Sequence, residues 1–214
     1  MCPRKMNVAE YDKTAREINA PLYRYYAQKI LEKTGITRGV CLDAGCGGGY
    51  LGLALAKMTR FSFIFLDKSS EMLERAALHI IEDKLDRRAG TLLADVHSIP
   101  LDDQSVDLVI SRGSMPFWED PGTAFKQIHR ILAPGGRAYM GGGRGSSEIR
   151  EEIAARMKQA GKEMHGMKRR DDGSSCGPHG RRAHRDYGGF LETAGITNYA
   201  VNRGDDGVWV EMWR

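Results

Sequence analysis

The sequence contains no run of about 18 apolar residues, the length that spans a bilayer, so we expect no membrane-spanning helix. The N-terminal stretch MCPRKMNVAEYDKTAREINAP mixes polar and charged side chains and lacks the apolar core of a secretory signal peptide. The four cysteines include no CxxC pair, which favours reduced thiols over a disulfide framework. Together these absences predict a cytoplasmic protein.

An excess of one charge is also absent from most of the chain. The formal net charge is +4, but residues 165–185 alone hold six Lys or Arg against two Asp, so the remainder is balanced. Nucleic-acid-binding proteins carry a broad basic surface, so we expect neither nucleic acid nor a membrane as the partner. A hydrophobic fraction of 41% is typical of a folded chain and supports one domain over residues 1–214.

Short apolar runs alternate with helix-like stretches from residue 39 onward. Buried strands are expected at 39–45, 61–67, 90–95, 106–112 and 136–142. Helices are expected between them at 49–58, 69–85 and 124–136, the last ending at Pro134-Gly135-Gly136. This alternation predicts an α/β fold with a Rossmann-like, mostly parallel sheet and helices on both faces.

The segments that flank this core differ from it in pattern. We divide the chain into an N-terminal helical cap (1–38), a core (39–143), a polar helix with a basic mobile loop (144–186), and a terminal helix with a β-hairpin (187–214). The turn GDDG between the last two apolar runs predicts that this hairpin is antiparallel. The hairpin brings the expected sheet to seven strands.

The segment LDAGCGGGYLG (42–52) places five glycines at the end of the first expected strand. Glycine costs conformational entropy, so this density indicates a ligand that approaches bare backbone. The next helix begins near Gly49 and offers unpaired N–H groups at its positive end. Asp67 ends the second strand, where a carboxylate can accept hydrogen bonds from two ribose hydroxyls. A ligand with an anionic end and a ribose fits both features.

Two nucleotide ligands have an anionic end and a ribose, a nicotinamide dinucleotide and S-adenosylmethionine. A dinucleotide fingerprint GxGxxG fails from Gly45, because Tyr50 holds the third glycine position, and a shifted match over 47–52 begins late. That match also leaves Asp43 where a carboxylate repels a pyrophosphate. S-adenosylmethionine (SAM) carries an ammonium group that Asp43 would attract, so SAM is favoured over a nicotinamide dinucleotide. A kinase-type GxxxxGK[ST] loop does not occur in the sequence.

Four segments resemble, in order, the motifs of class I SAM-dependent methyltransferases: VCLDAGCGGGYLGLALA, FLDKS, LLADVHSIPLDDQSVDLVISRGSMPFWED and ILAPGG. The resemblance covers about residues 36–143. It is closest to the small-molecule, type 11 group that includes quinone-biosynthesis enzymes, and to compact methyltransferases of anaerobic prokaryotes. It implies in-line methyl transfer from SAM to a small-molecule acceptor, with S-adenosylhomocysteine (SAH) as the product.

The resemblance also implies a cofactor site. Its expected contacts, from the methionine end of SAM to the adenine, are Asp43, Gly45, Gly47, Asp67, Lys68, Met72, Asp95 and Val96. Asp43 would lie near the ammonium, Asp67 would bind the ribose hydroxyls, and Asp95 would accept from the adenine amine. Some of these residues also have a purely structural alternative. Asp67 can cap the helix that follows, Asp95 can be an acidic residue of a loop, and Met72 is of a type more often found in the core.

The end of the fourth strand is expected to form the methyl-transfer end of the site. Ser111 and Arg112 would line it, and the arginine, unusual there for the family, would contact the SAM carboxylate or an anionic substrate. Phe117 and Trp118 either line a substrate pocket or pack at a helix start. Tyr11 is the tyrosine expected to close over the cofactor. The residues identify no catalytic base, and SRGS stands where nucleic-acid amino-methyltransferases carry [DN]PPY.

The basic segment 165–185 has three interpretations: a lid over the substrate, a surface loop, or a metal site formed by Cys176, His179 and His184. It also supports an alternative function, methylation of a protein or an RNA that this segment binds. Two further alternatives are a SAM-binding regulatory protein without turnover and a nicotinamide-dependent oxidoreductase.

Overall fold

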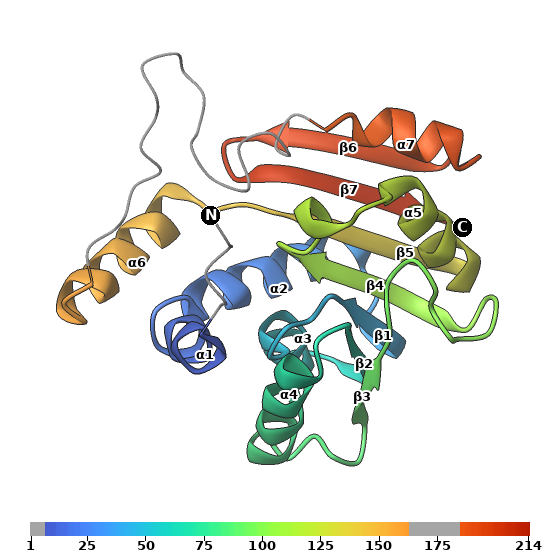
Figure 1. Ribbon diagram of the computed structural model, residues 1–214. Helices are drawn as coiled ribbons and strands as arrows, with labels where there is room; N and C mark the ends of the chain where they lie inside the picture. Colours follow the sequence, from blue (N-terminus) through green and yellow to red (C-terminus); the bar gives the residue numbers. More distant parts are fainter. Residues whose placement is uncertain (1–6, 163–184) are drawn as a thin grey trace, which may run out of the picture.

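One sheet forms the centre of the protein, in a computed structural model that describes residues 7–162 and 185–214 (Figure 1). Its strands are β1 (Arg38–Ala44), β2 (Arg60–Asp67), β3 (Ala89–Leu93), β4 (Val106–Arg112), β5 (Leu132–Gly142), β6 (Tyr199–Gly204) and β7 (Gly207–Trp213). Their order is β3-β2-β1-β4-β5-β7-β6. Strand β7 runs opposite to the other six strands and pairs in antiparallel with β5 and β6. The predicted seven-stranded, mostly parallel sheet with a C-terminal antiparallel hairpin is confirmed.

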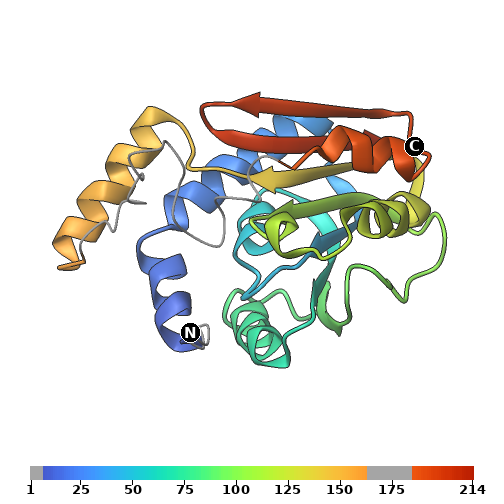
Figure 2. The same ribbon diagram turned by 45° about the horizontal axis from the view of Figure 1, so that its top comes forward.

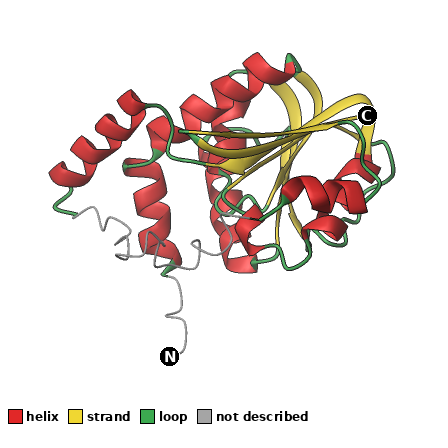
Figure 3. Cartoon of the chain, turned by 90° about the horizontal axis from the view of Figure 1, so that it is seen from above, coloured by secondary structure: helices red, strands yellow, loops and turns green. Residues whose placement is uncertain are grey.

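Helices cover both faces of this sheet, as expected (Figure 3). They are α1 (Val8–Glu17), α2 (Ala20–Thr34), α3 (Tyr50–Ala56), α4 (Ser70–Glu82), the 3-10 turn η1 (Met115–Phe117), α5 (Pro121–Ile131), α6 (Ser147–Gln159) and α7 (Tyr187–Thr193). Helices α1 to α4 pack on one face, and α5 and α7 on the other. Among the described residues, no helix is both long and apolar enough to cross a bilayer.

The strands supply both cores because successive side chains of a strand point to opposite faces. Phe65, Leu108 and Trp209 are buried beneath α2 and α3, whereas their neighbours Leu66, Val109 and Val210 are buried beneath α5 and α7. This two-sided burial explains why the central strands appear in the sequence as continuous apolar runs rather than alternating ones.

The helix expected at 124–136 is the clearest error in the predicted boundaries. In the structure α5 begins at Pro121 after the N-cap Asp120 and ends at Ile131, and β5 begins at once with Leu132. Leu132 pairs with Val106, and the register then shifts before Arg137 pairs with Leu108. The PGG segment therefore lies within an irregular stretch of the strand, because the proline cannot donate to the ladder.

Helix α6 differs from the other helices in contributing no buried residue. It projects from the end of β5, away from the sheet (Figure 2). It lies within the segment 144–186, where a polar helix was expected. The basic loop that was expected next lies almost wholly outside the described residues.

Candidate active site at the carboxyl edge of the sheet

The carboxyl ends of β1, β2 and β4 meet at one edge of the sheet. Strand β1 pairs with β2 on one side and with β4 on the other, all in parallel. The chain therefore leaves β1 at the point where the strand order reverses, and ligands of open α/β sheets bind at this point. The glycine turn after β1 is placed there.

The glycine turn uses its glycines for different purposes. Gly45 and Gly47 both have positive φ, +69° and +55°. A side-chain carbon on Gly45 would meet Cβ of Ser114 at 2.5 Å, so this position is needed for packing. At Gly47 the nearest atom to such a carbon is Sδ of Met72, 4.0 Å away. The space beside Gly47 is therefore open to a ligand that approaches the backbone.

Asp67 ties this turn to the end of β2. Its Oδ2 accepts a hydrogen bond from the Gly47 N–H at 2.8 Å, and its Oδ1 accepts from the Ser69 N–H at 2.9 Å. Helix α4 is capped by the hydroxyl of Ser69, which accepts from the Met72 N–H, so Asp67 is not the N-cap. A carboxylate has about four acceptor positions, which leaves Asp67 capacity for further donors such as hydroxyls.

Asp43 is enclosed, with 1% of its surface exposed. Its Oδ2 accepts a hydrogen bond from the Gly52 N–H at 3.0 Å, in the first turn of α3. Burial, with the neighbouring Asp67 charge, raises the pKa of Asp43 to about 7, although the bond from Gly52 opposes the shift. The side chain therefore supports the turn through the Gly52 N–H and has almost no surface to offer an ammonium group.

Asp95 lies in the loop after β3. It accepts from the His97 N–H at 2.9 Å and also pairs with the imidazole Nδ1 of His97. Partial burial opposes ionisation, but the hydrogen bonds from His97 and the positive Lys68 outweigh it and lower the pKa of Asp95. Val96 and Met72 are buried, whereas Lys68 is exposed. Asp95 is thus an ionised acceptor, as an adenine amine requires.

Ser111 is fully buried at the end of β4. Its Oγ lies 2.5 Å from Oγ of Ser114, which in turn donates to the carbonyl of Ala44 at 3.1 Å. The hydroxyl expected at the methyl-transfer end is therefore used to join the ends of β1 and β4.

Arg112, the next residue, packs against helix α2. Its Cζ lies 5.1 Å and 5.4 Å from the ring centroids of Tyr23 and Tyr26, and its Nη2 donates to the carbonyl of Gly143 at 3.0 Å. Its Nε is buried and has no hydrogen-bond partner among the described residues. An unpaired buried donor is costly, so this guanidinium is suited to an anion.

Helix α2 contributes a rigid tyrosine to this end. The Tyr26 hydroxyl donates to the carbonyl of Asp206 at 2.9 Å and accepts from the Gly145 N–H at 2.9 Å. Burial raises the pKa of Tyr26 to about 12, which keeps the phenol neutral. The contacts of Tyr23 and Tyr26 with Arg112 were not predicted, because the spacing of three between the tyrosines shows only that they share a helical face.

The remaining predicted site residues divide between surface and core. Trp118 is 4% exposed and packs edge-on against Phe125 of α5, which favours packing at a helix start, and its place in a substrate pocket stays a prediction. Phe117 and Tyr11 are exposed at 48% and 42%. Both stay predictions as substrate and cofactor contacts.

The proposed metal ligands Cys176, His179 and His184 all lie outside the described residues. Within residues 7–162 and 185–214, no group of three His, Cys, Asp or Glu side chains is arranged to hold a metal ion.

Comparison with known proteins identifies the family. Residues 42–140 match the model of a methyltransferase domain (Methyltransf_11). A crystal structure from Methanococcus maripaludis, described as a candidate SAM-dependent methyltransferase, is 36% identical with a TM-score of 0.83, covering 100% of this chain and 97% of that one. A SAM-dependent methyltransferase from Aquifex aeolicus shares the fold at 19% identity and a TM-score of 0.68, with 98% of each chain covered.

Curated relatives match over part of their length. A malonyl-[acyl-carrier protein] O-methyltransferase of Hamiltonella defensa is 31% identical over 55% of this chain and 43% of its own. A demethylmenaquinone methyltransferase of Lactobacillus johnsonii is 30% identical over 59% of this chain and 53% of its own. The chain thus spans about half the length of these relatives or less. It belongs to the class I SAM-dependent methyltransferases, enzymes with SAM as cofactor and SAH as product.

The residues present fit this cofactor. SAM carries a sulfonium and an ammonium, and the site presents two carboxyl side chains, Asp43 and Asp67, beside the glycine turn. Its ribose needs acceptors, which Asp67 retains beside the open space at Gly47. Its carboxylate, or that of an acceptor, suits the unpaired Nε of Arg112.

Proposed function

We propose that this chain transfers the methyl group of SAM to a small molecule that carries a carboxylate. The observation that carries the proposal is the guanidinium of Arg112, held at the end of β4 with a buried Nε that has no hydrogen-bond partner within residues 7–162 and 185–214. A guanidinium binds a carboxylate through parallel hydrogen bonds and is held here on two aromatic rings. The carboxylate would anchor the acceptor beside the turn that holds the cofactor.

The contribution of the chain to such a reaction is mainly positional. Bound SAM supplies a methyl group on a sulfonium. The backbone around Gly47 and the Asp67 carboxylate would hold the methionine and ribose parts, with Asp95 at the adenine, while Arg112 would orient the acceptor for in-line displacement. An acceptor atom that carries no proton needs no general base, so orientation alone can supply the acceleration.

A second acceptor class is supported by the curated relatives. Several of them are named malonyl-[acyl-carrier protein] O-methyltransferases, which supports an acidic acceptor presented on a carrier protein. The basic segment 165–185 would suit such a protein partner. The same segment keeps methylation of an RNA or a protein open as an alternative function. SAM binding without turnover is a further alternative.

The test measures SAH production over a panel of small carboxylic acids and their amides, for wild type, Arg112→Lys and Arg112→Met. We expect turnover of some acids, amides to be poor acceptors, and Arg112→Met to lower kcat/KM about a hundredfold through KM. Arg112→Lys keeps the charge and should recover part of the loss. Equal turnover of acids and amides by wild type would contradict the proposal.

Calorimetry separates the two anions that Arg112 could bind. SAH carries the amino-acid carboxylate, whereas 5′-methylthioadenosine lacks it. If Arg112 binds the acceptor, Arg112→Met binds both ligands as wild type does. If it binds the cofactor carboxylate, the variant loses affinity for SAH alone. Binding without turnover of any acid would favour the regulatory alternative.

A further inference from the structure

A buried histidine contacts the glycine turn. His79 lies on α4 with 5% of its surface exposed. Its Nδ1 lies 2.8 Å from the carbonyl oxygen of Gly48, in the middle of the turn. Its Nε2 lies 3.3 Å from Oδ1 of Asp12, on helix α1. One imidazole thus connects the turn to the N-terminal helix.

Tyr50 makes a second connection to the same carboxylate. It is the first residue of α3, directly after the turn, and its hydroxyl donates to Oδ1 of Asp12 at 2.7 Å. Its ring centroid lies 5.8 Å from that of His79. Asp12 therefore meets side chains from both helices that follow the turn, and its own side chain is only 15% exposed.

The directions of these bonds make the contact specific. A carbonyl oxygen only accepts, so Nδ1 of His79 donates to Gly48. On its other side the ring brings Nε2 within ion-pair distance of the Asp12 carboxylate, so the two nitrogens face two different segments. Charge-assisted bonds of this kind are stronger than neutral ones when they are shielded from water. We call the set of contacts Gly48–His79–Asp12 the α1 bridge.

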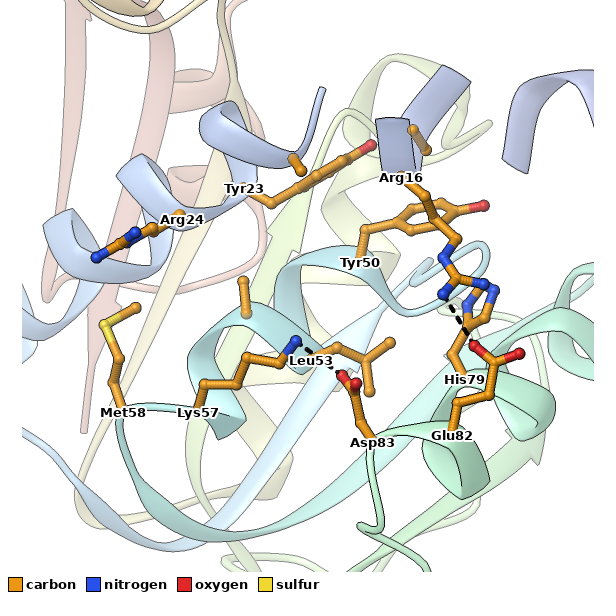
Figure 4. A pocket seen from close by; sticks show the side chains of 13 residues that line it. Arg16, Tyr23, Arg24, Tyr50, Leu53, Lys57, Met58, His79, Glu82 and Asp83 are labelled. Atoms are coloured by element: carbon orange, nitrogen blue, oxygen red, sulfur yellow. Dashed lines mark ion pairs between the residues drawn. The ribbon is translucent and has the colours of Figure 1, made fainter. Parts of the chain in front are cut away.

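Helix α1 has further contacts with the body, among them a hydrogen bond from Lys162 Nζ to Thr14 Oγ1 at 2.7 Å. Its buried residues are only Val8 and Ala15. Arg16 of α1 pairs with Glu82 of α4 at 2.9 Å, but both side chains are about half exposed, and exposed pairs contribute about 0–1 kcal/mol. Figure 4 shows this pair beside His79, at one end of a cavity of about 490 Å³ between the helices. The α1 bridge and the Tyr50–Asp12 hydrogen bond are thus the polar contacts that join α1 to the two helices after the glycine turn at a largely buried carboxylate.

We infer that Asp12 and His79 are positioning residues that couple the seating of α1 to cofactor binding at the glycine turn. Holding the Gly48 carbonyl fixes the peptide planes beside Gly47, where the cofactor approaches, and the same imidazole holds α1. Coupling of this kind is reciprocal, so SAH should stabilise α1 as much as seated α1 stabilises bound SAH. The inference rests on the proposed cofactor site at the turn.

The test combines calorimetric titration with SAH and hydrogen exchange of the α1 amides in the full chain. His79→Asn keeps a donor at the Nδ1 position but cannot reach Asp12, whereas His79→Gln keeps reach to Asp12 but loses the donor to Gly48. Asp12→Asn removes the charge with little change of shape. Arg16→Gln is the matched control, because it breaks the exposed pair between the same two helices without touching the bridge.

We expect SAH to slow exchange in α1 of wild type and of Arg16→Gln, and to bind both within about twofold. The His79 and Asp12 variants should bind SAH about tenfold more weakly, with the protection of α1 by SAH lost. Thermal unfolding without ligand identifies any variant that is not folded; the partly exposed Asp12→Asn remains usable if a His79 variant is not.

Two results would overturn the inference. In the first, the His79 and Asp12 variants lose thermal stability, but SAH binds them and protects α1 as in wild type. The α1 bridge would then only stabilise the fold. An equal loss of affinity in Arg16→Gln would show that any contact between α1 and α4 suffices. Wild type that does not bind SAH, or an Asp67→Ala variant that binds it unchanged, would instead contradict the cofactor site itself.

Discussion

The two halves of the carboxyl edge are built in different ways. After β1 and β2, the site consists of backbone and short acids, with Gly47 and Asp67 joined by a hydrogen bond. At the end of β4, it consists of a long side chain, Arg112, held on the rings of Tyr23 and Tyr26. The first half suits a ligand that is the same throughout the family, the cofactor. The second half suits an acceptor that differs from one enzyme to another.

The difference teaches where each function is encoded. The first half is local, because its groups come from one turn and the end of the next strand, 20 residues apart for Gly47 and Asp67. The second half depends on distant segments: Tyr26 contacts Gly145 and Asp206, 119 and 180 residues away in the chain. A change in the first half should therefore alter cofactor affinity, and a change in the second should alter acceptor use.

The largest expected effect is that of Gly45→Ala in the first half. The new methyl group would need a positive φ and would meet Ser114, which is itself held by Ala44. We expect a loss of about 2–4 kcal/mol in the free energy of unfolding, measured in urea. Gly47→Ala is the control: it should cost about 1 kcal/mol of stability but weaken SAH binding more strongly. Equal losses of stability would contradict the distinct roles assigned to the two glycines.

The next effect concerns Asp43 and pH. Its pKa is raised from 3.8 to about 7 in the folded chain, so between these values the folded chain holds a proton that the unfolded chain has released. Its contribution to stability therefore falls as the pH rises through this interval and is constant above it. Asp43→Asn cannot ionise but still accepts from Gly52.

Urea unfolding of wild type and Asp43→Asn at about pH 5 and about pH 8 tests this shift. The stability of wild type relative to the variant should be lower at the higher pH by an amount on the order of 2 kcal/mol. A relative stability that is the same at both pH values would mean that the carboxylate is charged throughout, despite its burial.

A smaller effect is expected from Tyr26→Phe in the second half. The variant keeps the ring beneath Arg112 but leaves the Gly145 N–H without its acceptor, at a cost of about 1 kcal/mol. The loss should loosen the segment after β5 and raise KM for the acceptor a fewfold, with SAH affinity unchanged. A matching loss of SAH affinity would show that the two halves are not separable.

Local and distant encoding also explain which features could be predicted from the sequence. The sheet, the glycine turn and the place of Asp67 follow from strand, turn and helix patterns with fixed spacing, so they were found. The buried positions of Ser111 and Trp118, the tyrosines on Arg112 and the α1 bridge depend on packing between distant segments, which no local pattern reports. The end of α5 was misplaced because a register shift in the sheet, rather than the PGG motif, sets it.

The smallest expected effect concerns Asp95, which is predicted to bind the adenine in the first half of the site. Asp95 is ionised and held by His97, so it should prefer the amine of SAH to the carbonyl of S-inosylhomocysteine by about fivefold, the value of one partly exposed hydrogen bond. Asp95→Asn presents both a donor and an acceptor, so its affinities for the two ligands should become nearly equal, while its affinity for SAH falls only about twofold. Competitive titration of the two ligands measures the ratio directly. A preference for SAH that persists in the variant would mean that another group binds the adenine amine, so that Asp95 would not belong to the cofactor half. Loss of the preference would mean that the cofactor half is formed by residues adjacent to β1, β2 and β3 alone.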